Sequence, residues 1–151
     1  ELGESYVPYV VETSIGLDRM FLTVLSHSFC EEELENGESR VVLKIPAVLA
    51  PIKAAILPLT KKDGMPEKAR EILKTLQVDF NCQYEEKDSI GKRYRRQDAI
   101  GTPFCITVDH QTLEDNTVTL RDRDTMKQER VSVDKLHAII AEKVNISNYL
   151  V

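Results

Sequence analysis

The chain has 151 residues, of which 42% are hydrophobic and 30% charged, and its formal net charge is -5. This length suits one domain of ordinary size, and no apolar run approaches the roughly 18–20 residues that a membrane span needs. The three cysteines are odd in number and far apart, and the histidines show no ligand spacing to them, so we expect reduced thiols, no metal site and a cytoplasmic location.

The N-terminal region predicts a short strand followed by a helix. Residues 5–11 read as a strand interrupted by Pro8, and Ser14 is placed to cap a helix that runs to about Cys30 with apolar side chains at helical spacing. Residues 31–38 hold five glutamates and no basic residue, which is typical of a solvated linker. We therefore expect two units, residues 1–38 and residues 39–151.

Because the chain starts at a glutamate and enters a structured segment at once, we expect a piece of a longer protein.

The second unit shows alternating strand and helix patterns. The strands are either continuous apolar runs or segments in which apolar and polar residues alternate, and apolar residues recur at helical spacing in the helices. In chain order we expect strands at 41–45 and 53–59, a helix from Pro66, a strand at 78–84, a helix at 89–99, a strand at 104–108, a hairpin of 118–120 with 130–133, and a last helix capped by Asp134.

This order of elements predicts the fold class. Strands separated by helices need crossover connections and therefore form a parallel part of a sheet, while a hairpin adds an antiparallel edge. We expect an α/β fold with a mixed five-stranded sheet flanked by about three helices, preceded by the strand and helix of the first unit.

A basic segment interrupts the acidic background of the chain. Lys92, Arg93, Arg95 and Arg96 surround Tyr94 within the helix expected at 89–99. A local cationic patch on an acidic protein favours contact with a polyanion. A solvated helix face is the equal alternative from the residues alone.

The tip of the expected hairpin carries alternating charges, Arg121-Asp122-Arg123-Asp124. Arginine donors and aspartate acceptors suit the edges of unpaired nucleobases. The same residues also suit cross-strand ion pairs, which contribute little at a surface. Neither reading is excluded by composition.

A third candidate site lies in the first unit at residues 12–19. A strand that ends in Glu12, followed by Ser14 and by a helix with Arg19 in its first turns, would place a carboxylate, a hydroxyl and a guanidinium around one pocket. Such a pocket suits an ammonium group and a phosphate. The alternative is that Ser14 only caps the helix and Arg19 pairs with Glu12 or Asp18.

Three segments together resemble the glycyl-tRNA synthetase family of class II aminoacyl-tRNA synthetases. Residues 11–19, Val-Glu-Thr-Ser-Ile-Gly-Leu-Asp-Arg, resemble motif 3, and residues 90–104 and 118–126 resemble the anticodon-binding domain. They stand in the family's order, and the resemblance covers essentially the whole chain. It implies that residues 1–38 are the end of a catalytic domain with its linker, and that residues 39–151 are an anticodon-binding domain.

The resemblance also implies roles for single residues. In the parent enzyme, Glu12, Ser14 and Gly16 would contact glycine, and Gly16, Leu17, Asp18 and Arg19 would contact ATP. Thr13 departs from the proline that the family commonly has there. The residues at the anticodon of tRNA-Gly would be Lys92, Arg93, Arg95, Arg96, Arg121, Asp122, Arg123 and Asp124.

Motifs 1 and 2 of the family are absent from this sequence. The resemblance implies a homodimeric parent that uses ATP and Mg²⁺ to form glycyl-adenylate and then charges tRNA, but we expect this chain alone to be inactive in a pyrophosphate-exchange assay. Two alternatives remain from the sequence: a non-catalytic accessory protein with a synthetase-like fold, of the DNA polymerase accessory subunit type, and a dimerisation or scaffold module.

Overall fold

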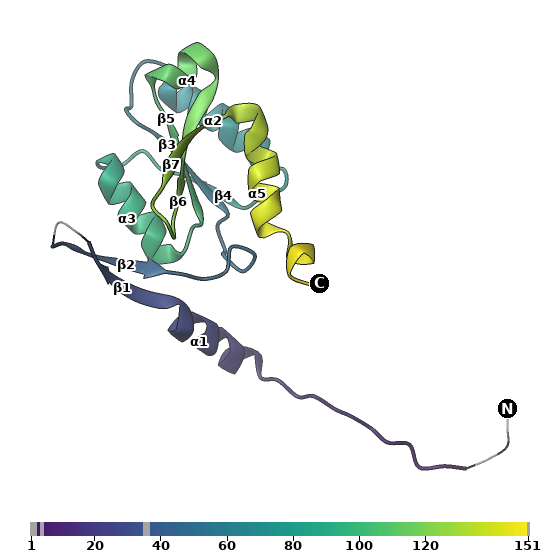
Figure 1. Cartoon of the computed structure of the whole chain (residues 1–151). Coiled ribbons are helices and arrows are strands. Elements are labelled where there is room, and N and C mark those ends of the chain that lie inside the picture. Colours follow the sequence, from purple (N-terminus) through teal and green to yellow (C-terminus); the bar gives the residue numbers. More distant parts are fainter. Residues whose placement is uncertain (1–2, 4, 35–36, 151) are drawn as a thin grey trace.

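Figure 1 shows a computed structural model of the chain, which describes residues 3, 5–34 and 37–150. A five-stranded sheet with helices on both faces forms the main body. A helix and a two-stranded hairpin precede this body and lie beside one end of it, and an extended segment leads away from them to the N-terminus.

The sheet confirms the predicted mixed topology. Its strand order is β4-β3-β5-β6-β7. Strand β3 is parallel to both β4 and β5, and β6 is antiparallel to both β5 and β7. Every residue of β3 and β5 is buried, as expected for parallel strands covered on both faces. The bounds are β3 Ala54–Pro58, β4 Cys82–Tyr84, β5 Phe104–Val108, β6 Thr117–Asp122 and β7 Gln128–Ser132.

Helices on the two faces divide the core in two. Alternate residues of β3 point to opposite faces, so Ile56 packs with α2 (Met65–Leu76) and α5 (Leu136–Val144), whereas Leu57 packs with α3 (Ile90–Ile100). The α2 and α5 face holds the larger cluster. Tyr94 of α3 covers the smaller one, which links the aromatic residue of the basic segment to the core.

Four details of this unit differ from the sequence prediction. A short helix, α4 (His110–Asp115), follows β5, and a capping box between Asp109 and Thr112 starts it. β4 is shorter than expected, because Val78 lies in an exposed turn. Asp134 does not cap the last helix but lies in a 3₁₀ turn, η1 (Val133–Lys135), before α5. A second 3₁₀ turn, η2 (Ile146–Tyr149), follows α5.

The first unit departs further from expectation. Residues 5–16 form no strand, because no second strand lies beside them in the described part of the chain, and Tyr9 and Val11 are fully exposed. The helix α1 (Leu17–Ser28) starts after Gly16, so Ser14 is not its cap. Much of its predicted inward apolar face is also exposed.

The first part of the acidic segment, residues 31–33, lies in a strand. β1 (Phe29–Glu33) pairs antiparallel with β2 (Ser39–Leu43), so the predicted boundary at residue 38 falls inside a hairpin. β2 packs along α3, and its inward residues Arg40 and Val42 are buried. The hairpin is therefore packed against the second unit through the contact of β2 with α3.

Gly101 makes this packing possible. It ends α3 with φ +83°, a left-handed conformation that glycine adopts at no steric cost. A Cβ atom here would lie 2.8 Å from Ile45 Cγ2 and 3.0 Å from the carbonyl oxygen of Leu43. The glycine therefore lets the end of α3 approach the segment that follows β2.

Gly101→Ala tests this close approach. We expect it to lower the free energy of unfolding by about 3 kcal/mol, since the left-handed conformation costs about 1–2 kcal/mol and the overlap adds a similar amount. The control is Gly64→Ala, because Gly64 has φ +79° with open space around its Cβ position and should lose only about 1 kcal/mol. Urea unfolding measures both, and equal losses would contradict the packing argument.

Candidate nucleic-acid interface

The basic residues of α3 point in different directions from one helix. Arg93 lies on the face against the sheet and is 2% exposed, while Lys92 lies on the exposed face. Arg95 reaches toward β2, and Arg96 reaches toward the segment after β4. The segment does not form one continuous cationic surface.

Arg93 has an internal role. Its guanidinium donates to the carbonyl oxygens of Pro58 at 2.7 Å, Glu85 at 3.2 Å and Leu59 at 3.4 Å, which follow the ends of β3 and β4. Burial lowers the pKa of this guanidinium below its usual value. The prediction that Arg93 faces RNA is wrong for this structure, because no phosphate can reach the buried group.

Arg95 and Arg96 remain half exposed but have acidic partners. Arg95 bonds to Glu38 at 2.7 Å and to the carbonyl of Ser39 at 2.6 Å. Arg96 pairs with Glu85 and with Asp88. Surface pairs of this kind exchange readily with other anions, so these two arginines keep the capacity to bind phosphate.

Lys92 is exposed and makes no ion pair in the described part of the chain. It borders an open groove of about 630 Å³ at α3, together with Glu38, Ser39, Gly91 and Arg95. The groove therefore carries two cations, of which Arg95 is paired with Glu38.

Two arginines are buried at the end of β6, Arg121 in the strand and Arg123 in the turn that follows it. Arg121 is 5% exposed and donates to the Asp98 carboxylate of α3 at 2.7 and 2.9 Å, with its guanidinium 4.8 Å from the centre of the Tyr94 ring. Arg123 is 3% exposed and donates to the carbonyl of Gly101 at 2.8 Å. The prediction that these two side chains contact bases directly is therefore wrong for this structure.

The aspartates of the turn behave differently from each other. Asp122 accepts from the backbone N–H groups of Asp124 and Thr125 and from the Thr125 hydroxyl, so it shapes the turn. Asp124 holds the Arg123 guanidinium at 2.8 and 2.9 Å, yet half of its side chain stays exposed. The turn therefore offers Asp124, Thr125, Met126 and Lys127 to solvent.

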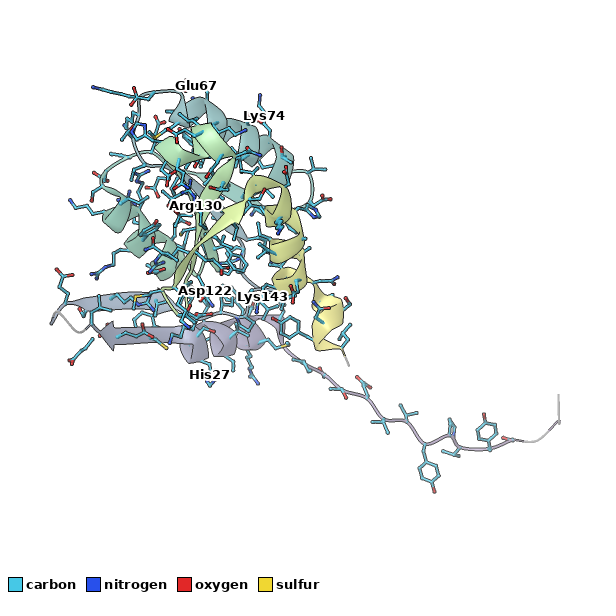
Figure 2. All side chains as sticks on the ribbon, turned by 45° about the horizontal axis from the view of Figure 1, so that its top comes forward. His27, Glu67, Lys74, Asp122, Arg130 and Lys143 are labelled. Carbon is cyan, nitrogen blue, oxygen red and sulfur yellow. The ribbon has the colours of Figure 1, made fainter. Side chains whose placement is uncertain are left out.

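A second groove, of about 220 Å³, opens between this turn and α5. Phe104, Leu120 and Ile139 are its apolar lining residues. Its polar residues include Asp122 and Lys143, which lie near each other at the same end of the sheet in Figure 2. An apolar floor with a polar rim suits a flat, partly polar group such as a nucleobase.

The sequence prediction missed the two residues that organise this end of the fold. Asp98 is fully buried in α3, and Arg40 is buried in β2, with their side chains 3.0 Å apart. An aspartate close to basic residues in Arg95-Arg96-Gln97-Asp98 was the available signal, because a carboxylate can provide the counter-charge for arginines that fold inward.

The residues of segment 12–19 do not assemble into a pocket. Glu12, Ser14 and Arg19 are exposed, and no hydrogen bond or ion pair joins them within the described residues. The nearby groove of about 420 Å³ along α1 is apolar, lined by residues that include Phe21 and Leu25. The residues present do not fit ATP or a metal ion by themselves, and no three potential metal ligands gather in residues 3, 5–34 and 37–150.

No helix in the described part of the chain is long and apolar enough to cross a membrane.

The three cysteines carry free thiols, two of them buried, and burial raises the pKa of Cys82 to about 11 and that of Cys105 to about 12. The thiols of Cys82 and Cys105 are therefore structural and unreactive at neutral pH.

Comparison with known proteins assigns the sheet-containing part of the chain to a known domain family. The family profile described as "Anticodon binding domain" matches residues 53–143. The crystal structure of the RNA binding domain of threonyl-tRNA synthetase from Cryptosporidium parvum Iowa II superimposes with a TM-score of 0.60 at 24% identity, covering 66% of this chain and 25% of that one. This likeness shows the fold.

Sequence relatives extend the match over nearly the whole chain. Glycine–tRNA ligase from Clostridium tetani is 54% identical over 95% of this chain and 31% of its own length. The enzymes of the same name from Borrelia hermsii and Chlorobaculum tepidum are 50% and 54% identical over 97% and 94% of this chain, and over 33% and 30% of their own. The chain thus spans about a third of the curated relatives it matches.

Asp98→Asn tests the importance of the buried carboxylate. We expect a loss of about 3–5 kcal/mol in the free energy of unfolding, because the change leaves the Arg121 guanidinium buried without its counter-charge and removes one of the two carboxylate partners of Arg40. Asp115→Asn is the matched control, since Asp115 is 41% exposed and lies 4.0 Å from Arg130; its loss should stay below about 1 kcal/mol. Similar losses in the two variants would contradict the assigned role of Asp98.

Proposed function

The chain belongs to the anticodon binding domain family, and from this we propose that it binds the anticodon stem-loop of a glycine tRNA as the anticodon-binding part of a glycine–tRNA ligase. The observation that carries the proposal is the extent of the family match. Residues 53–143 run from the residue before β3 to the penultimate residue of α5, and so include the whole five-stranded sheet. The names of the sequence relatives favour this function over an accessory or scaffold protein.

Two surfaces bind the RNA backbone. Lys92 and Arg95, beside the groove at α3, contact backbone phosphates, and Lys127 and Lys143, beside the groove at α5, contact them on the other side of the turn. Because the net charge is -5, affinity depends on these local cations and falls with salt.

Base discrimination belongs to the exposed part of the turn. Asp124 and Thr125 present oxygens to solvent on a turn whose base is buried. Carboxylate and hydroxyl oxygens accept from the amino groups of unpaired bases. Arg121, Asp122 and Arg123 support the turn from beneath, so their contribution to recognition passes through its shape.

The catalytic steps belong to the longer protein. We propose that the parent enzyme is cytoplasmic, forms a homodimer, and makes glycyl-adenylate from glycine and ATP with Mg²⁺ before transfer to tRNA. Glu12, Ser14 and Gly16 would then contribute to its glycine site, and Gly16 to Arg19 to its ATP site, once further segments complete the pocket. The exposed state of these residues in this chain is consistent with an incomplete site.

Titration of the chain with a stem-loop RNA tests the proposal. We expect the glycine anticodon stem-loop to bind more tightly than the same stem-loop with one anticodon base changed, by about 1–3 kcal/mol. Fluorescence anisotropy at low salt measures both affinities. Absence of binding, or equal affinity for the two RNAs, would overturn the proposed function.

Lys92→Ala separates backbone contact from base recognition. We expect weaker binding to both stem-loops by the same factor, and a salt dependence whose slope is smaller by about 1, because one phosphate contact is lost. Lys74→Ala is the control, since Lys74 of α2 lies at the end of the molecule away from Asp122 in Figure 2. Loss of discrimination in Lys92→Ala, or an equal effect of Lys74→Ala, would contradict the assignment.

A further inference from the structure

Arg40 of β2 reaches the turn after β6 from outside the matched domain. Its side chain is 1% exposed, and its Nη1 donates to the Asp98 carboxylate at 3.0 Å and to the backbone carbonyl of Arg123 at 3.1 Å. Its Nε donates to Glu32 of β1 at 2.7 Å. One guanidinium thus joins the β1–β2 hairpin, α3 and the turn.

The carbonyl that Arg40 holds is at the base of the exposed turn. Arg123 is fixed on three further sides, because its N–H donates to the Pro103 carbonyl at 3.0 Å and its guanidinium holds Gly101 and Asp124. Asp124, the next residue, is the first exposed acceptor of the turn. A shift of the Arg123 carbonyl therefore moves the group that faces the ligand.

We propose that Arg40 is a positioning residue for anticodon discrimination: it sets the place of the β6–β7 turn without touching RNA. This inference rests on the proposed function of the turn. By this proposal the β1–β2 hairpin contributes to RNA recognition through Arg40, although the family match begins only at residue 53.

The geometry requires an arginine at this position. Three acceptors from three elements surround the group in different directions, and the planar fork of a guanidinium supplies donors to all of them, whereas a lysine is a compact point charge. Arg40 Nη2 also lies 2.6 Å from Glu32 Oε2, outside hydrogen-bond geometry. The site uses both the charge and the shape of the side chain.

Charge balance makes the removal of Arg40 tolerable for folding. Asp98 keeps its two bonds from Arg121, and Glu32 keeps Lys44, so neither carboxylate is left without a cation. The specific loss is the donor to the Arg123 carbonyl. A change in discrimination can therefore be separated from a loss of the fold.

The test compares Arg40→Met and Arg40→Lys with the unchanged chain, using the glycine anticodon stem-loop and the same stem-loop with one anticodon base changed. We expect the ratio of the two affinities to fall about three- to tenfold in both variants, well below their unfolding temperatures. Affinity for the changed stem-loop should stay within about twofold, since the phosphate contacts are intact. Salt slopes for both RNAs should also stay unchanged.

Arg130→Met is the matched control. Arg130 forms a half-buried pair with Asp109 and bonds to Thr117, at the end of β6 away from the turn. It should lower the unfolding temperature and leave the affinity ratio unchanged.

Each outcome decides a different claim. If the unchanged chain shows no preference between the RNAs, the proposed function fails. If it shows the preference and a folded Arg40→Met retains it in full, the positioning role of Arg40 fails while the proposed function stands. If Arg40→Met does not fold, Arg40→Lys decides in the same way, and unfolding of both variants would overturn the proposal in favour of a purely structural role.

Discussion

A single buried carboxylate, that of Asp98, holds together the end of the fold where the turn lies. It accepts from Arg121 of β6 and from Arg40 of β2, and it lies on α3, between these two strands. Without it, the Arg121 guanidinium would be buried with no counter-charge, a state that costs several kcal/mol, and Arg40 would keep only Glu32. The positions of the helix, the sheet and the N-terminal hairpin at this end therefore depend on the same group.

This arrangement explains why an acidic chain has so many arginines near its proposed RNA-binding surface and yet exposes few of them. Arg93 closes the carbonyl ends of two strands, Arg121 and Arg123 support the turn, and Arg40 ties the hairpin to both. Arginine suits these positions because one planar group satisfies several acceptors at fixed angles. The cations that remain exposed are mostly lysines, whose flexible point charges suit phosphates.

Much of the fold could be predicted from the sequence, because the pattern of apolar residues is set by burial. Strands β3 and β5 are continuous apolar runs, and α2 repeats its apolar residues at helical spacing, so their positions and the parallel crossover follow. β1 and the short α4 were missed. The first is rich in glutamate, and its inward position is set by the partner Arg40; the second depends on a capping box across only four residues.

The candidate site was predicted less well than the fold, for a physical reason. Whether an arginine points to solvent or to the interior depends on a counter-charge that comes from a distant part of the chain, as Asp98 does for Arg40 across 58 positions. Local spacing does not show which distant arginine such an aspartate will pair with. For this reason Arg93, Arg121 and Arg123, which the sequence placed at the RNA-facing surface, point inward in the structure.

The buried supports also bear on how the turn recognises a ligand. A flexible turn would lose conformational entropy on binding, and that loss would reduce the affinity for every RNA. Here Arg123 is fixed through its N–H, its carbonyl and its side chain, and Asp122 closes the turn by accepting from Asp124 and Thr125. The exposed oxygens are thus held in place before any ligand binds. On the proposed function, a base that does not match them would meet a rigid surface, and discrimination would depend on the buried supports as much as on the exposed groups.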